Sequence, residues 1–188
     1  MELKSTAYVI LGLLHLHPMS GYEIKSFVDR TTRFFWAASY GQIYPELRRL
    51  AEAGLIEGTS KPSGGRRRVE YRLTAAGRKE LRSWLQVAPE VNESRDEALL
   101  KLFLADAEPE AGIEALEAKR RFHAEKLEQL REIEPVAKAG PNRFPYLVAS
   151  YGIAHSEWAI AWCDEVLAEL RAELSAPQTK TKAPRRSA

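Results

Sequence analysis

A short stretch of alternating side chains constrains the fold more than any other feature of this sequence. Between positions 68 and 73, apolar residues alternate with charged ones, which is the period-two pattern of a half-buried strand. Positions 55–61 form a matching second strand, and the Pro-Ser-Gly-Gly stretch at 62–65 is typical of a turn. The sequence therefore predicts a β-hairpin that carries three consecutive basic side chains at its tip: Arg66, Arg67 and Arg68.

Three helical segments precede this hairpin. The first begins near Ser5 and has apolar residues at positions 7, 10, 11 and 14, which form one stripe. The second begins at Ser20–Glu23, an S-x-x-E capping box. The third has a second capping arrangement at positions 39–42, an apolar stripe at 43, 47 and 50, and a stop at Gly54. Pro45 lacks a backbone donor and is expected to bend or delay the start of this third helix. Thr74 caps a helix after the hairpin.

Three helices followed by a basic-tipped hairpin form the plan of a winged helix-turn-helix. In that fold the third helix enters the major groove of DNA and the hairpin contacts the phosphate backbone. Gln42 is expected near base edges, whereas Tyr44 and the arginines are placed for phosphates. An arginine triplet at a turn is also common as a solvated loop, and Tyr44 could equally pack between helices. The candidate DNA-binding residues are Ser39, Tyr40, Gln42, Tyr44, Arg48, Arg49, Arg66, Arg67 and Arg68.

The charge is unevenly distributed along the chain. Residues 1–85 hold 14 Lys and Arg against 8 Asp and Glu, while residues 86–175 hold 10 against 18. This asymmetry indicates that only the first part meets a polyanion. We expect a DNA-binding domain at 1–85, a linker at 86–93, a helical dimerisation domain at 94–175 and a disordered basic tail at 176–188. The longest apolar run is too short to span a membrane, and we expect a cytoplasmic protein.

The second half has the pattern of a helical dimerisation domain. A capping box at positions 94–97 opens one helix, Pro109 opens another, and the latter has a coiled-coil-like seam of apolar residues interrupted by Arg120 and His123. A last helix carries a broad apolar face, which is expected to be core or dimer interface, with an effector pocket as the alternative. The single Cys163 is expected in the core. The expected dimerisation residues are Ile113, Leu116, Leu127, Leu130, Tyr151 and Trp158, and the candidate pocket residues are Phe103, Trp158 and Trp162.

Several local motifs resemble the PadR family of bacterial transcriptional regulators, including its longer-tailed, Vir-like subgroup. They are GYE at 21–23, SYGQIYPEL at 39–47, GGRRR at 64–68 with YRLTAAG at 71–77, RDEALLKLF at 95–103 and YGIAH at 151–155. The resemblance covers about residues 5–175. It implies a homodimeric repressor that binds an inverted repeat in double-stranded promoter DNA and is often released by a small-molecule effector. It also implies that the third helix accommodates Pro45 near its beginning.

Two other classes of function compete with this interpretation. An enzyme is disfavoured because the sequence has no nucleophile elbow, no metal-ligand cluster and no glycine-rich nucleotide loop. His15 and His17 are two residues apart, so they lie on different sides of a helix, and neither a metal nor a cofactor is expected. A winged helix that only docks another protein remains the stronger alternative, because the fold alone does not guarantee DNA binding.

Overall fold

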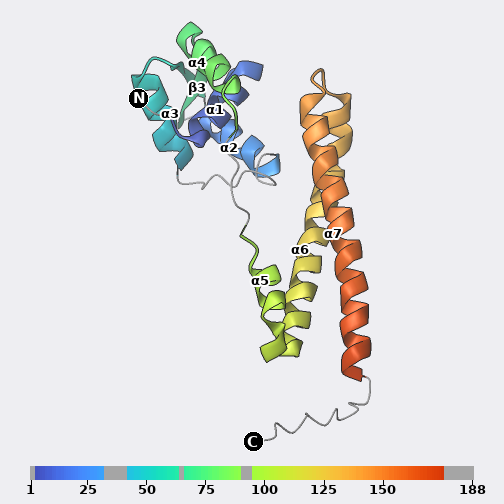
Figure 1. Cartoon of the computed structure of the whole chain (residues 1–188). Helices are drawn as coiled ribbons and strands as arrows, with labels where there is room; N and C mark the ends of the chain where they lie inside the picture. Colours follow the sequence, from blue (N-terminus) through green and yellow to red (C-terminus); the bar gives the residue numbers. More distant parts are fainter. Residues whose placement is uncertain (1–2, 32–41, 64–65, 90–94, 176–188) are drawn as a thin grey trace, which may run out of the picture. The chain divides into compact units, whose positions relative to one another are not determined.

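The chain forms two compact units, Met1–Asn92 and Glu93–Ala188, each with its own core (Figure 1). This computed structural model describes residues 3–31, 42–63, 66–89 and 95–175. The described elements are mainly helical, with one small sheet in the first unit, so the predicted fold class is confirmed. Among these residues no helix has both the length and the apolar character that crossing a bilayer requires.

The first unit combines four helices with a three-stranded antiparallel sheet. The strands lie in the order β1-β3-β2, and the first of them, only two residues long, was not predicted. In chain order the elements are α1 (Ser5–Leu16), β1 (Met19–Ser20), α2 (Gly21–Arg30), α3 (Ile43–Glu52), β2 (Ile56–Ser63), β3 (Arg66–Leu73) and α4 (Ala75–Leu85). The hairpin strands extend farther than the sequence pattern indicated, because Pro62 pairs with Arg67 and Ser63 with Arg66. The predicted turn at 62–65 therefore narrows to positions 64–65.

Local hydrogen bonds explain where these elements begin and end. The predicted capping box of α2 is present, because the Ser20 hydroxyl accepts from the Glu23 amide and the Glu23 carboxylate accepts from the Ser20 amide. Gly54 follows α3 with a φ of +69°, a left-handed conformation that favours glycine at a helix end. The Thr74 hydroxyl accepts from the amide of Gly77 and caps α4, as expected. At α1, however, Lys4 is the capping position and Ser5 is already helical.

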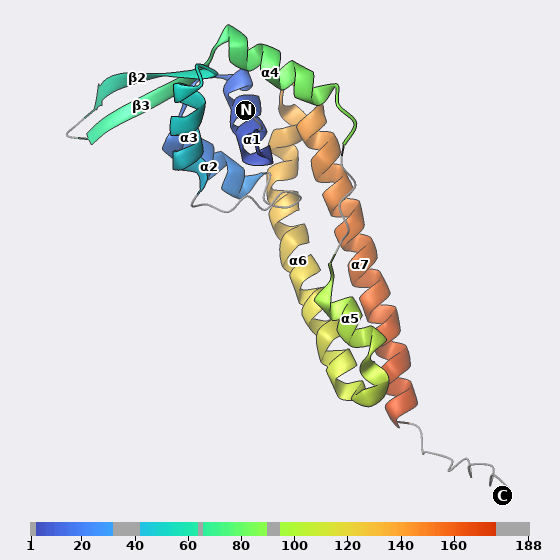
Figure 2. The same ribbon diagram turned by 60° about the vertical axis from the view of Figure 1, so that its left-hand side comes forward.

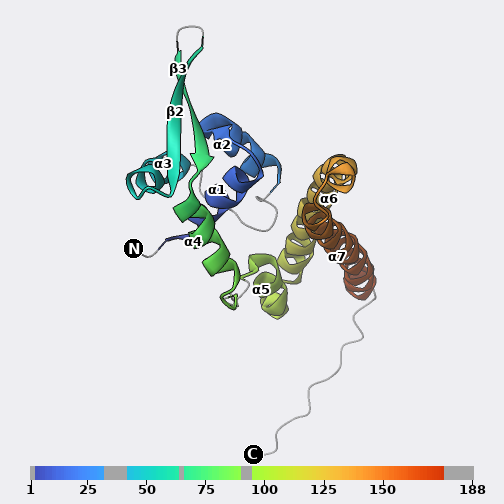
Figure 3. The same cartoon turned by 90° about the horizontal axis from the view of Figure 1, so that it is seen from above.

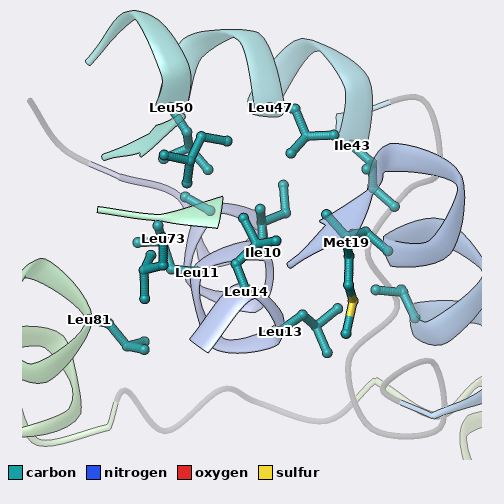
Figure 4. Close-up of a cluster of buried hydrophobic side chains, with 14 residues drawn as sticks. Ile10, Leu11, Leu13, Leu14, Met19, Ile43, Leu47, Leu50, Leu73 and Leu81 are labelled. Carbon is teal, nitrogen blue, oxygen red and sulfur yellow. The ribbon is translucent and has the colours of Figure 1, made fainter. Parts of the chain in front are cut away.

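The core of the first unit lies where α1 meets α3 and the sheet. Figure 4 shows the three leucine and isoleucine side chains of α3, Ile43, Leu47 and Leu50, directed toward the side chains of α1. All three are buried, which confirms the predicted stripe. The other buried apolar residues include Ile10, Leu11, Leu14, Met19, Leu73 and Leu81. One face of α3 is therefore fixed by packing, and its opposite face is left to solvent.

The second unit is a helical hairpin with a short helix packed along it. Its elements are α5 (Glu97–Phe103), a 3-10 turn η3 (Ala105–Ala107), α6 (Pro109–Ala139) and α7 (Phe144–Ser175). The two long helices run side by side in both Figure 1 and Figure 2, and α5 packs on α6. Pro109 occupies the start of α6, as predicted. The cap of α5 differs from the prediction: Asp96 accepts from the Leu99 amide and the helix begins at Glu97.

The coiled-coil-like seam of α6 packs against α7 of the same chain. Leu116 and Leu130 are buried, and Arg120 forms a two-point contact with Asp164 of α7. Leu116 and Leu130 are thus core residues of one chain, which corrects their expected place at a dimer surface. A heptad spacing specifies that a helix has an apolar partner, but it does not specify which chain supplies that partner.

Candidate nucleic-acid interface

Helix α3 presents a polar face because its apolar face is held in the core. Gln42, Tyr44 and Arg48 are exposed on this helix, as the sequence analysis expected. Gln42 occupies the capping position, yet its side chain makes no capping hydrogen bond, contrary to the predicted S-x-x-Q arrangement. Ser39 and Tyr40, two further candidates, lie outside the described residues.

Pro45 fits α3 without breaking it. The helix begins at Ile43, so Pro45 is its third residue. The first backbone N–H groups of a helix have no intrahelical acceptor, so the donor that proline lacks is not needed here. The proline therefore starts the helix at a fixed place, which sets the position of Gln42 and Tyr44 at its N-terminal end.

Two charged residues of α3 are less exposed than the wheel pattern suggested. Glu46 is buried, and Arg49 is half-buried with its Nη1 atom 3.6 Å from Glu46 Oε2. The Oε1 atom of Glu46 is buried without a hydrogen-bond partner in the structure. Of the two neighbouring arginines, Arg48 is therefore the one directed to solvent.

Tyr44 serves packing and surface at once. A Cβ atom added at Gly21 would lie 2.8 Å from Tyr44 Cε1 and 3.1 Å from Leu47 Cδ1, so α2 and α3 approach closely at this glycine. The tyrosine nevertheless remains 49% exposed. Its ring thus lies against the start of α2 while the remainder of the side chain is open to solvent. Sequence reasoning missed Gly21, although the small residue directly after a capping serine was a signal for close approach.

The β2–β3 hairpin projects away from the helices of its own unit (Figures 2 and 3). A cross-strand ion pair joins Arg72 Nε to Glu57 Oε1 at 2.7 Å near the base of the hairpin. Toward the tip, the side chains of Arg66 and Arg67 lie outside what the structure describes, although their backbone is part of β3. The hairpin geometry therefore supplies an extended arm with basic residues in its outer part.

Arg68 differs from the expected picture of a solvated wing arginine. Its Nη2 atom lies 2.5 Å from Glu23 Oε1 of α2, and both side chains are about half exposed, at 50% and 47%. The hydrogen bond from Arg68, followed by those from Ser20, lowers the pKa of Glu23 to about 2. The same contact raises the pKa of Arg68 above its ordinary value. Glu23 was identified from sequence only as a helix cap.

The second unit leaves part of its expected apolar face exposed. Tyr151 is 71% and Trp158 61% exposed on α7, whereas Trp162 is half-buried against the Leu116 core. The rings of Trp158 and Trp162 are 6.3 Å apart and nearly parallel, and His155 lies beside Trp158. Ile113 is also half-buried against that core, and Leu127 borders a shallow groove between α6 and α7.

The three candidate pocket residues do not all share one environment. Phe103 is 83% exposed on α5, while its neighbour Leu102 packs on the core that contains Trp162. Successive helical residues point about 100° apart, so Phe103 turns away from that core. Among the described residues, no ring contact joins Phe103 to either tryptophan.

Polar groups inside the helical unit include one buried histidine. His123 lies between α6 and α7, and its Nδ1 atom has no hydrogen-bond partner in the structure. Burial, together with the positive charge of Lys119, lowers the pKa of His123 to about 4. Cys163 is buried in the same core, as expected, and burial raises the pKa of its thiol.

Comparison with known proteins places both units. Residues 10–83 match the transcriptional regulator PadR-like family, and residues 94–171 match the virulence activator alpha C-terminal domain. The chain is 29% identical over 172 residues to the negative transcriptional regulator PadR of Bacillus subtilis, with 86% of this chain and 94% of that protein covered.

Solved structures agree with this result. The structure of Bacillus subtilis PadR in complex with operator DNA is similar, with a TM-score of 0.78 and 27% identity, over 89% of this chain and 99% of that one. The same protein in complex with p-coumaric acid gives a TM-score of 0.73 at 27% identity over the same shares. These relatives belong to a family of regulators, not of enzymes.

Proposed function

Because the chain belongs to the PadR-like family of transcriptional regulators, we propose that it is a repressor that binds an inverted-repeat promoter operator as a homodimer. The observation that carries the proposal is the division of α3 into a buried apolar face and an exposed face with Gln42, Tyr44 and Arg48. The first 85 residues also hold six more basic than acidic side chains. Operator DNA is the ligand in one similar structure.

In this proposal α3 lies in the major groove. Gln42, at the N-terminal end of the helix, hydrogen-bonds an adenine edge, which a glutamine amide matches with one donor and one acceptor. Arg48 and the Tyr44 hydroxyl contact phosphates and set the position of the helix without reading sequence. Arg66 and Arg67 contact the phosphate backbone beside the groove from the outer part of the hairpin.

A second copy of the chain covers the exposed residues of the helical unit. Tyr151 and Trp158 on α7 are large side chains that remain open to solvent, as are Leu100, Phe103 and Leu104 on and after α5. Burial of such side chains stabilises association by about 25 cal/mol per Å² of apolar surface removed from water. Dimerisation also places a second reading helix about 34 Å away, at the next half-site on the same side of the DNA.

We further propose that a small-molecule effector releases the repressor from DNA. A phenolic acid is bound in one similar structure. In this chain the neighbouring rings of Trp158 and Trp162 offer an aromatic surface on α7, and the structure gives Phe103 no place beside them. The proposed effector surface therefore consists of the two tryptophans.

A salt titration separates DNA binding from the alternative of a protein-docking winged helix. Affinity for duplex DNA should fall steeply as salt rises, because each phosphate contact releases condensed counterions. Arg67→Ala should reduce the slope of log affinity against log salt by about 0.9 on all duplexes. Gln42→Ala should instead change the ranking of operator sequences. A protein that binds no duplex even at low salt would be a docking module.

A further inference from the structure

We propose that Glu23 and Arg68 act together as positioning residues that fix the wing hairpin to the start of α2, so that Arg68 is not a phosphate contact. The inference rests on the proposed DNA binding, and it removes one residue from the expected contact set. It also assigns Glu23 a role in DNA recognition that its place in a capping box does not imply.

Glu23 uses both carboxylate oxygens, and each one holds a different element. Its Oε2 atom accepts from the Ser20 amide at 2.8 Å and from the Ser20 hydroxyl at 2.9 Å. Its Oε1 atom accepts from Arg68 Nη2 at 2.5 Å. Ser20 itself belongs to β1 and pairs with Glu70 of β3. One carboxylate therefore connects the first turn of α2, the short strand β1 and the wing strand β3.

The location of Arg68 makes this connection effective. Arg68 pairs with Lys61 in the third register pair from the turn, after Ser63 with Arg66 and Pro62 with Arg67. A two-stranded ribbon bends and twists readily when nothing holds its sides. An ion pair at the third register pair restrains the direction of the outer residues, which include Arg66 and Arg67, relative to α2.

The charge around Arg68 also disfavours phosphate binding at this residue. Glu23 is in direct contact, and Glu70 is a second negative charge close enough to favour the charged guanidinium. A phosphate approaching Arg68 would meet these carboxylates, whose repulsion offsets part of the attraction of the arginine. Phosphates gain more at the outer arginines, Arg66 and Arg67.

The chain offers a matched control pair on the same sheet. Glu57 and Arg72 form an exposed ion pair between β2 and β3 near the base of the hairpin, without any link to α2. Glu57→Gln and Arg72→Gln therefore change the charge by the same amounts as Glu23→Gln and Arg68→Gln. Glutamine at position 23 keeps an amide oxygen that can accept from the Ser20 backbone, so the helix cap survives.

The experiment measures operator affinity and its salt dependence for these four variants and for the Glu23→Gln/Arg68→Gln double variant. We expect Glu23→Gln to bind about threefold more weakly than Glu57→Gln, as for the loss of an exposed ion pair. Arg68→Gln should be weaker than Arg72→Gln by a similar factor with the same salt slope, and the double variant should be no weaker than either single variant. Tighter binding by Glu23→Gln than by Glu57→Gln, or a slope for Arg68→Gln about 0.9 smaller than for Arg72→Gln, would overturn the inference.

Amide hydrogen exchange tests the same pair without DNA. Peptides covering β3 should exchange faster in Glu23→Gln than in Glu57→Gln, because the hairpin opens more often once it is detached from α2. Equal exchange in the two variants contradicts the positioning role. If the parent protein binds no duplex at any salt, the proposed function fails, and the exchange result still decides whether Glu23 holds the wing.

Discussion

Replacement of Gly77 by alanine tests the junction between the wing and α4. An added Cβ atom would lie 2.1 Å from the Leu55 carbonyl oxygen and 2.7 Å from Leu73 Cδ1. Ordinary contacts begin near 3.4 Å, so the backbone at this junction must separate by more than 1 Å. The Thr74 hydroxyl donates to the carbonyls of Gly54 and Leu55, and these hydrogen bonds would be strained by that movement.

The expected loss follows from these contacts. Overpacking against backbone costs about 1–3 kcal/mol, and each weakened hydrogen bond costs about 1 kcal/mol. The helix gains about 0.5–1 kcal/mol from alanine in place of glycine. We therefore expect Gly77→Ala to lower the free energy of unfolding of the first unit by about 2–4 kcal/mol.

Gly12→Ala in α1 is the matched control. No atom lies within 4 Å of a Cβ added at Gly12, so the helix-propensity gain is unopposed and this variant should be stabilised by about 0.5–1 kcal/mol. Urea unfolding gives the size of each change, and amide exchange read peptide by peptide assigns it to the first unit. A Gly77→Ala protein as stable as the parent would refute the close approach of α4 to Leu55.

Three further outcomes are expected. The second unit should lose stability as the pH falls from about 6.5 to about 4, because the unfolded chain binds a proton at His123 before the folded chain does; His123→Leu should flatten this dependence in urea unfolding. Trp158→Glu should shift the dimer toward monomer in sedimentation, whereas Tyr22→Glu, an exposed aromatic of the first unit, should not. Leu47→Ala should destabilise the first unit by about 2–5 kcal/mol in urea unfolding, and an unchanged midpoint would contradict its place in the core.

The parts of the fold that depend on local rules could be predicted from the sequence. The capping box at Ser20, the buried stripe of α3 and the stop at Gly54 each follow from a few neighbouring residues. The order of three helices and a hairpin then limits the possible folds to a few, and the winged helix was among them.

The parts that depend on contacts distant in sequence could not be predicted. The strand β1 is two residues long and exists only because β3 lies beside it. The seam of α6 shows a heptad spacing, but only the structure identifies α7 of the same chain as its partner. The contact of Arg68 with Glu23 joins residues 45 positions apart, and no periodicity in the sequence indicates it.

The position of the α7 faces shows the same limit. Its apolar residues form a broad stripe, and sequence reasoning treated this stripe as one surface. In the structure Cys163 and Leu167 fill the core, Trp162 lies at the edge, and Tyr151 and Trp158 remain exposed. The division depends on how the two long helices are rotated against each other, which is set by packing and not by hydrophobicity alone.

Hydroxyl-radical footprinting on an operator selected from genomic fragments tests the central claim most directly, with the number of bound chains measured on the same duplex. We expect two chains per duplex and two protected half-sites of an inverted repeat, with centres about 10 base pairs apart or at a multiple of that spacing. One bound chain with a single protected patch, or no protection at low salt, would contradict the account.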